Sequence, residues 1–203
     1  MLSETATALF LRDGFDNVSI ADVAAAAEVA KATVFNYFPN KEDLVLYQIR
    51  DHADEPAEVV RSLSPDESPI GALRRSFLAG LAARDAKTGL ADDDKLIAFY
   101  TMVMSTPSLK LRLLELWMRS ESTLTDALAD VLGEPADAIL AGALASQIIA
   151  VQRTLVVRNL QRVIEGERTA ELYPVCVAEA EQVFSLLERC LPGVAALPEN
   201  VAG

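Results

Sequence analysis

The sequence contains few of the residues on which active sites, metal sites and disulfide frameworks depend. Its 203 residues include one histidine and two cysteines, which offer neither a nucleophile–base pair nor a cluster of metal ligands. We therefore expect no enzymatic activity, no metal and no cofactor. Cys176 and Cys190 lie fourteen residues apart on one predicted helix, about 21 Å along its axis, which is too far for a disulfide. Two reduced thiols in a cytoplasmic protein are expected rather than a redox sensor.

Glycine, proline and aromatic side chains are also scarce. Gly and Pro number nine each and aromatic residues make up 6%, whereas hydrophobic residues, mainly alanine and leucine, make up 51%. Ala and Leu lose little side-chain freedom in a helix, and no segment keeps the period-two alternation of a β-strand. The composition therefore predicts an all-α protein with a core of considerable size.

Long uninterrupted apolar runs are missing as well. The N-terminus has neither a basic segment nor a long apolar run, so a secretory signal is not expected. The most apolar stretch, 139–157, is interrupted by Ser146, Gln147, Gln152 and Arg153, so a membrane-spanning helix is not expected either. A helix that is apolar nearly all round is usually buried on several sides. We expect a cytoplasmic protein with no membrane partner.

Helical periodicity predicts four short helices followed by five longer ones. Gly14 ends the first helix, Ser19 begins the second in a capping box with Asp22, and Asn40 begins the fourth. The predicted ranges are about 2–13, 20–26, 31–38 and 41–52, then 69–85, 92–105, 107–132, 135–165 and 168–191.

A polar segment with two prolines, 62–69, is the clearest linker between these groups of helices. We predict an N-terminal domain over residues 1–52, a C-terminal helical domain over 53–191 and a tail over 192–203.

The second and third short helices, joined by a turn of about four residues, have the arrangement of a helix-turn-helix. In that motif one helix braces against the DNA backbone while the next lies in the major groove with its apolar side inward. Val34 and Phe38 are four residues apart and are expected to pack inward, with Val29 just before them. The other side chains of the third helix include the small and polar groups that a groove-facing surface needs.

The run from Ala8 to Leu44, ALFLRDGFDNVSIADVAAAAEVAKATVFNYFPNKEDL, resembles the DNA-binding domain of the TetR family of transcriptional regulators. Its markers are the LF and GF pairs, IADVA, V-x-K-x-T-V-F-x-Y-F and P-x-K-E-D-L, which together are specific in their order and spacing. The resemblance covers about a fifth of the chain. It implies base or groove contacts by Lys31, Ala32, Thr33 and Asn36, and phosphate contacts by Ser19, Thr33, Tyr37 and Lys41.

These roles suit the side chains, because hydroxyl groups donate to phosphate oxygens and an asparagine amide can pair with adenine. Four of these residues also have a structural alternative. Thr33 would support its own helix, Asn36 would face water, Tyr37 would lie partly in the core, and Lys41 would be a solvated charge at a helix start.

The sequence departs from the family pattern at two positions and in its charge. Glu28 stands where a glycine is usual, so we expect a differently shaped turn, and Ala30 lacks the usual hydroxyl cap, at a cost of about 1 kcal/mol. The net charge of the chain is −12, and its first fifty residues hold four basic against seven acidic side chains. Family members usually carry a basic arm before the first helix, and whether one belongs to this protein is left open.

By the same resemblance, the residues after about 55 form a regulatory domain whose last two helices build a four-helix bundle in a homodimer. Apolar stripes suit that role, although they also suit packing within the chain. They comprise Leu144, Ile148, Val151 and Leu155 on one helix, and Val175, Val183, Leu186 and Leu187 on the other.

An inducer pocket is expected among the central helices, with adaptable apolar walls and a few polar groups. The alternatives are ordinary core for the apolar residues, and solvent or the dimer seam for the polar ones. The expected ligand-binding residues are Phe77, Phe99, Tyr100, Met102, Trp117, Met118, Gln147 and Arg153.

The resemblance thus implies a repressor that binds a pseudo-palindromic operator in double-stranded DNA and is released by a small lipophilic inducer. A helical ligand-binding or adaptor protein with weak or lost DNA binding is the alternative.

Overall fold

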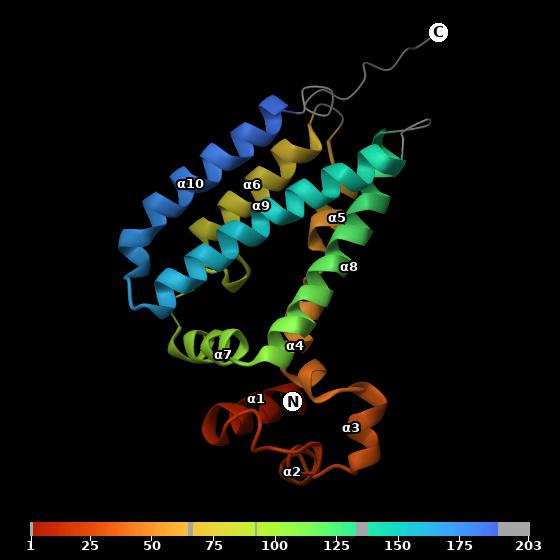
Figure 1. The fold of residues 1–203 in the computed structure, drawn as a ribbon, viewed down its shortest axis with the longest axis vertical. Coiled ribbons are helices and arrows are strands. Elements are labelled where there is room, and N and C mark those ends of the chain that lie inside the picture. The colour runs from red at the N-terminus through yellow and green to blue at the C-terminus, as the bar shows by residue number, and fades with distance from the viewer. Residues whose placement is uncertain (1, 65–66, 92, 133–137, 191–203) are drawn as a thin grey trace. The chain divides into compact units, whose positions relative to one another are not determined.

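The computed structural model describes residues 2–64, 67–91, 93–132 and 138–190. All regular structure within these ranges is helical (Figure 1), which confirms the predicted all-α class. The predicted tail, 192–203, lies outside the described residues.

The chain divides into two compact units. One comprises Met1–His52 and Asp93–Leu116, and the other comprises Ala53–Asp92 and Trp117–Gly203. The predicted boundary after His52 is also a boundary between the units. Residues 93–116, however, were predicted to belong to the second domain. An amphipathic pattern indicates that a helix has a buried face, but it does not identify the segment that covers this face. The functional domain limits stay a prediction.

The first unit contains four short N-terminal helices, together with α7 (Asp94–Ser105) and the part of α8 (Pro107–Leu132) up to Leu116. The four short helices are α1 (Leu2–Asp13), α2 (Ile20–Ala26), α3 (Lys31–Tyr37) and α4 (Lys41–Asp51). Helix α1 packs against α2, α4 and α7. Its Phe10 is buried and lies 5.2 Å from the Phe15 ring, between centroids.

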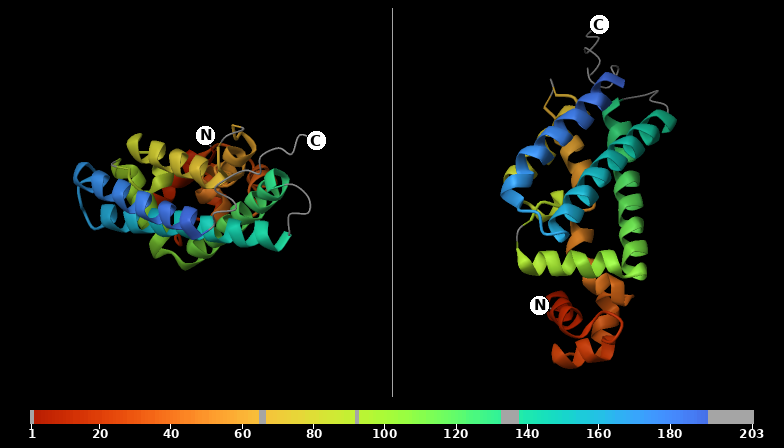
Figure 2. Two further views of the ribbon diagram at one scale, coloured as in Figure 1. Left: turned by 90° about the horizontal axis from the view of Figure 1, so that it is seen from above. Right: turned by 60° about the vertical axis from the view of Figure 1, so that its left-hand side comes forward.

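The second unit contains α5 (Glu55–Arg61), α6 (Pro69–Ala82), a short 3-10 helix η1 (Ala86–Thr88), the remainder of α8, α9 (Ala138–Ile164) and α10 (Thr169–Cys190). Helix α10 packs against both α6 and α9 (Figures 1 and 2). Helix α6 ends three residues earlier than predicted, since Arg84 adopts a left-handed φ of 56°. Sequence analysis did not predict η1.

The turn after η1 approaches α9 so closely that only glycine fits. Gly89 has a φ of 75°, and a Cβ there would lie 2.3 Å from the Val156 carbonyl oxygen. The buried Asn159 side chain donates from Nδ2 to the Thr88 carbonyl oxygen at 2.9 Å. Together, the glycine and the asparagine fix the η1 turn against α9.

One stretch of α9, Ile139–Ile164, is long and apolar enough to cross a membrane, with a mean hydropathy of 1.5. Core helices of soluble proteins pass the same test. Arg153 and Arg158 stand within this stretch, and an arginine at the centre of a bilayer costs about 3 kcal/mol on insertion scales. We therefore interpret α9 as a helix that packs against protein.

Candidate DNA-binding site

Helix α2 begins as the sequence predicts, in a capping box between Ser19 and Asp22. The Asp22 backbone N–H donates to the Ser19 hydroxyl at 3.2 Å, and the Ser19 N–H donates to Asp22 Oδ2 at 2.8 Å. The Ser19 hydroxyl also donates to the same carboxylate, and these hydrogen bonds lower the pKa of Asp22. Ser19 is exposed, so a phosphate would compete with Asp22 for its hydroxyl proton.

The turn between α2 and α3 keeps a left-handed residue although no glycine is present. Glu28 has a φ of 55°, so the expectation of a differently shaped turn is wrong. Val23 and Val34, one on each helix, are both fully buried. Helix α2 packs against α3, and this packing holds Glu28 in a conformation that L-residues disfavour.

Helix α3 presents a polar face and buries an apolar one. Val34 is fully buried and Phe38, just after the helix, is 6% exposed, as predicted. The predicted groove-facing residues are exposed except for Thr33, which is half-buried; the exposed ones are Lys31, Ala32, Asn36 and Tyr37. No side chain caps the start of α3, because Ala30 occupies the N-cap.

Tyr37 is 67% exposed, which argues against a core role and leaves its hydroxyl available to a phosphate. Phe35, which sequence analysis did not single out, is 44% exposed on the same helix. The Lys31 ammonium lies 5.6 Å from the Phe35 ring centroid, within cation–π range. An exposed phenylalanine on a recognition helix can contact a thymine methyl group.

Lys41 is half-buried and held by backbone groups of the α1–α2 connection. Its Nζ donates to the carbonyl oxygens of Phe15 at 2.7 Å and Val18 at 3.2 Å, and lies 4.1 Å from the Phe15 ring centroid. A lysine has three N–H donors, so one remains for a phosphate. Lys41 is thus neither a free surface charge nor a fully available phosphate ligand.

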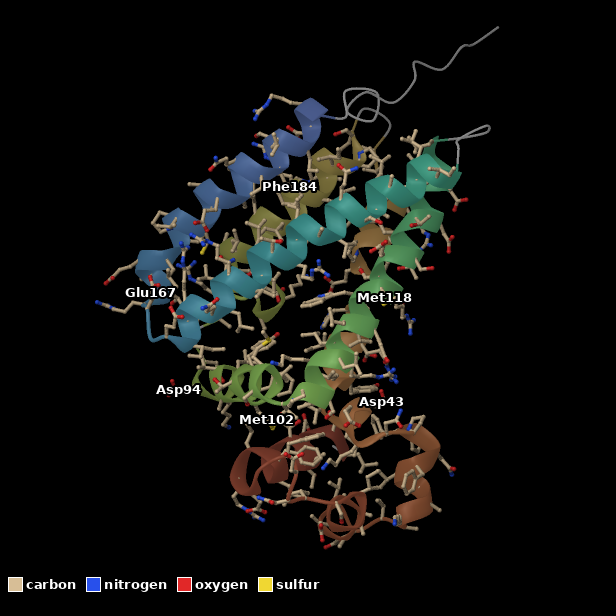
Figure 3. All side chains as sticks on the ribbon, in the orientation of Figure 1. Asp43, Asp94, Met102, Met118, Glu167 and Phe184 are labelled. Atoms are coloured by element: carbon tan, nitrogen blue, oxygen red, sulfur yellow. The ribbon has the colours of Figure 1, made fainter. Side chains whose placement is uncertain are left out.

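The first turn of α4 contains a buried carboxylate, Asp43, which is 5% exposed and is labelled in Figure 3. Its Oδ2 accepts the Asn40 backbone N–H at 3.3 Å, and its Oδ1 accepts Arg112 Nε at 2.9 Å. The hydrogen bonds to Glu115 and Asp43 raise the pKa of Arg112. Arg112 belongs to α8 and is 69 residues from Asp43, so no sequence pattern marks the pair.

The expected ligand-binding residues are distributed over both units. Phe99, Tyr100 and Met102 belong to the first unit, and the other five to the second. The Phe99 and Tyr100 rings meet edge to face at 5.3 Å between centroids, and both residues are half-buried, as is Met102. Their role in a pocket stays a prediction.

Of the five in the second unit, the structure brings Arg153 and Trp117 together, with the guanidinium 5.5 Å from the ring centroid. Phe77 is 8% exposed and its ring lies 6.0 Å from that of Phe184, between centroids. Met118 is 70% exposed (Figure 3), and the exposed Gln147 donates from Nε2 to a carbonyl of its own helix.

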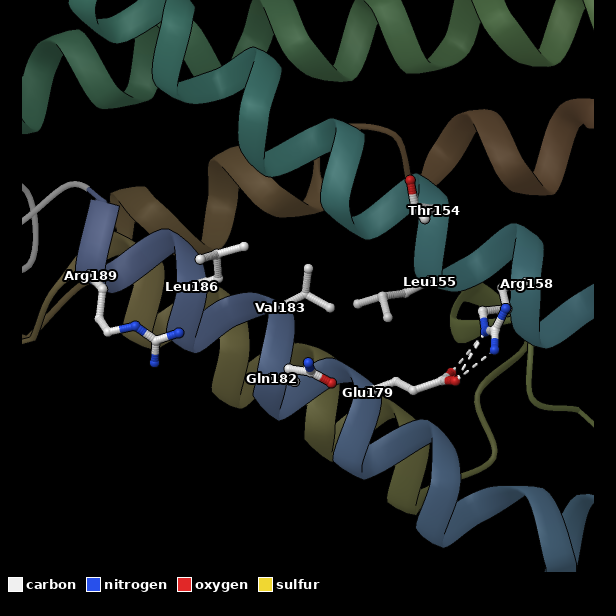
Figure 4. A pocket seen from close by; sticks show the side chains of 8 residues that line it. All are labelled: Thr154, Leu155, Arg158, Glu179, Gln182, Val183, Leu186 and Arg189. Atoms are coloured by element: carbon white, nitrogen blue, oxygen red, sulfur yellow. Dashed lines mark hydrogen bonds and ion pairs between the residues drawn. The ribbon is translucent and has the colours of Figure 1, made fainter.

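A groove of about 380 Å³ runs between α9 and α10, and it contains none of the eight expected ligand residues. Figure 4 shows its apolar middle, formed by Leu155, Val183 and Leu186, and the Arg158–Glu179 ion pair at one end. Its other lining residues are Thr154, Gln182 and Arg189.

The expected seam residues divide by burial. The side chains buried within the chain are Leu144, Ile148, Leu155 and Leu187, whereas Val175 and Leu186 are 42% and 51% exposed. The buried members therefore belong to the core of the chain, and Leu186 and Val175 form the outward surface. Val151 and Val183 lie between these extremes.

Residues 2–47 match the family model described as bacterial regulatory proteins, tetR family. The HTH-type transcriptional regulator LuxR of Vibrio harveyi is 52% identical over 44 residues, which are 22% of each chain. TcmR of Streptomyces glaucescens is 33% identical over 123 residues, which are 59% of this chain and 52% of TcmR. The chain thus spans about half or less of the length of these relatives.

Solved structures extend the likeness of fold to nearly the whole chain. NalD of Pseudomonas aeruginosa has a TM-score of 0.54 at 18% identity, covering 93% of this chain and 92% of its own. GusR of Salmonella enterica has a TM-score of 0.52 at 18% identity, covering 94% and 93%. Residues 2–47 therefore match the N-terminal segment of the tetR family of bacterial regulatory proteins, and the described chain shares its fold with these solved regulators.

Proposed function

We propose that the protein is a cytoplasmic DNA-binding transcriptional regulator that represses its target genes until a small lipophilic ligand releases it from the operator. The observation that carries the DNA-binding part is the two-sided character of α3. Val34 is fully buried while Lys31, Asn36 and Tyr37 are exposed on the short helix that follows the turn. A helix of this kind suits the major groove, where it can reach base edges.

The proposed contacts follow from the exposed chemistry of this site. Asn36 pairs with an adenine edge, Lys31 contacts a guanine or a phosphate, and the Tyr37 hydroxyl donates to a phosphate oxygen. Ala32 allows close approach to the groove, and the half-buried Thr33 contributes a hydroxyl at its margin. Ser19 and the remaining N–H of Lys41 supply further phosphate contacts.

The proposed assembly is a homodimer formed through the outward faces of α9 and α10. Exposed Val175 and Leu186 and the groove beside them provide an apolar surface that a second copy would cover. A twofold dimer would present two α3 helices to half-sites about one duplex turn apart, or about 34–36 Å. The operator is then pseudo-palindromic.

Repression and release by a ligand are proposed as a population shift. NalD is itself a secondary repressor of the MexAB-OprM multidrug efflux pump, which supports a repressor role by likeness of fold. A ligand changes DNA affinity only if it binds the DNA-competent and released states unequally. The Arg153–Trp117 pair, which lies within the second unit, suits an apolar ligand with one polar end.

A selection experiment tests the proposal. The full-length protein would be used to enrich duplexes from a random pool at low salt, and the enriched duplex would be measured in a mobility-shift assay. We expect a pseudo-palindromic sequence bound more tightly than random duplex by about a thousand-fold or more. If no duplex were enriched, the result would favour a helical ligand-binding or adaptor protein. The excess of acidic residues among the first fifty is consistent with that alternative.

A further inference from the structure

Arg112 contacts the DNA-binding segment from outside the residues that match the family model. It lies in the second turn of α8, well beyond residues 2–47. Its Nε and Nη2 lie 2.9 and 2.8 Å from Asp43 Oδ1. Its Nη1 donates to Glu115 on its own helix. The guanidinium is therefore held on two sides by carboxylates.

Within the part of the chain that the structure describes, Arg112 is the one cation paired with Asp43. The Asp43 side chain is 5% exposed, and its other oxygen, Oδ2, accepts the Asn40 backbone N–H at 3.3 Å and Asn40 Nδ2 at 3.2 Å. A buried carboxylate that loses its cation is left with a large desolvation penalty. The position of the Asp43 carboxylate therefore depends on Arg112.

Asn40 connects this carboxylate to the recognition helix. It is the N-cap of α4, and only Phe38 and Pro39 separate it from the last residue of α3, Tyr37. Proline fixes its own φ and restricts the residue before it, so this connection has little freedom. Because the Asp43 carboxylate accepts the Asn40 N–H, it also fixes the direction of the chain between the end of α3 and the start of α4.

We propose, on the basis of the proposed DNA-binding function, that Arg112 is a positioning residue for the DNA-binding site, acting through Asp43 and Asn40 on the end of α3. It contacts no DNA, because its donors face Asp43 and Glu115.

The test compares Arg112→Met with a matched control, Arg119→Met, in the full-length protein. Arg119 lies two turns further along α8 and also pairs with an aspartate, Asp54, at 2.9 Å. The probe is the duplex that the wild-type protein enriches from a random pool. At a temperature where all variants are folded, we expect Arg112→Met to bind this duplex about ten-fold more weakly. Arg119→Met should stay within about two-fold of the wild type.

Two further readouts separate positioning from a phosphate contact and from a loss of stability. A lost phosphate contact would lower the slope of log K against log salt by about 0.9, whereas Arg112→Met should leave the slope unchanged. In an Asp43→Asn background, Arg112→Met should have little further effect, because the partner of the arginine is already changed. Arg112→Lys should recover part of the affinity.

Failure to enrich a duplex would count against the proposed function alone. Hydrogen exchange of the free protein would still test the inference about Arg112. The amides of residues 40–47 should exchange faster in Arg112→Met than in Arg119→Met. Equal exchange in the two variants would overturn the inference. So would unchanged duplex affinity in Arg112→Met, or a reduced salt slope.

Discussion

Leu186 and Leu187 are neighbours on α10, yet one side chain is exposed and the other is buried. Leu186 is 51% exposed and lines the α9–α10 groove, whereas Leu187 is 7% exposed and belongs to the core. Leu186 therefore belongs to a surface that a second copy can cover, whereas Leu187 belongs to the core that stabilises the fold of the chain.

This pair gives a test of the proposed dimer. Leu186→Glu should yield a folded monomer, because a charge at the centre of an apolar interface opposes association. Leu187→Glu should fail to fold, because it buries a charge in the core. Light scattering and circular dichroism distinguish the outcomes. A normal Leu186→Glu dimer would place the interface elsewhere. Leu155, 3% exposed, is unsuitable for this test since its substitution would damage the core itself.

Replacing Glu28 by glycine should stabilise the protein. Its φ of 55° is disfavoured for a residue with a Cβ, and removing that strain gains about 1 kcal/mol. Denaturant unfolding would measure the change. Glu28→Ala is the control, since it removes the same charge and keeps the Cβ. Equal stabilisation by both variants would show that charge repulsion, not backbone strain, is the cause.

A hydroxyl at the start of α3 should also stabilise the protein. Ala30 has the extended backbone of an N-cap, with a φ of −67° and a ψ of 141°, but offers no acceptor. Ala30→Ser should raise the free energy of unfolding by about 1 kcal/mol, because serine can accept a backbone N–H of the first turn. Ala30→Val, which has no acceptor, should give no such gain. If the valine variant matched the serine variant, capping would not be the reason.

Removing the Tyr37 hydroxyl should weaken binding to every duplex alike. Tyr37→Phe deletes one proposed phosphate contact, worth about 1 kcal/mol or about five-fold in affinity. Stability should be unchanged, because the residue is 67% exposed. Mobility shifts with the enriched and a scrambled duplex would measure both losses, and Tyr173→Phe on α10 serves as the control. A loss confined to one sequence would assign Tyr37 to base contact instead.

Glu179 should make stability depend on acid pH. Burial raises the pKa of Glu179, but hydrogen bonds from Arg158 and Arg162 more than offset this, so the pKa lies below its usual value. Its stabilising contribution is complete above about pH 4.5 and is lost as the pH falls through the lowered pKa.

At pH 7, Glu179→Gln should therefore be less stable than the wild type by about 1 kcal/mol. That difference should shrink as the pH falls below about 4. Glu171→Gln, at an ion pair whose two side chains are 79% and 72% exposed, should show almost no difference at any pH. A constant gap for Glu179→Gln between pH 7 and pH 3 would contradict the assignment.

Local features of the fold were predictable from the sequence because their causes lie within a few residues. Gly14 ends α1 with a φ of 89°, and Ser19 and Asp22 cap α2 over a separation of three. The inward side of α3 followed from the four-residue spacing of Val34 and Phe38. These capping and spacing patterns are predictable because every α-helix has the same backbone geometry.

The remaining features depend on contacts between distant segments. No local pattern shows that Lys41 meets carbonyls 23 and 26 residues earlier, or that Arg112 meets Asp43. The turn at Glu28 was predicted wrongly for the same reason, since tertiary packing of α2 on α3 outweighs a single residue's backbone preference. The exposure of Phe35 also required the orientation of α3 in three dimensions.

The way Lys41 is bound has a consequence for how such a regulator would find its target. Four cations stand among the first fifty residues, and Lys41 already faces two carbonyl oxygens within its own domain. Electrostatic attraction to arbitrary chromosomal DNA supplies most of the residence time during one-dimensional sliding. Residues 2–52 would by themselves therefore hold arbitrary DNA only weakly.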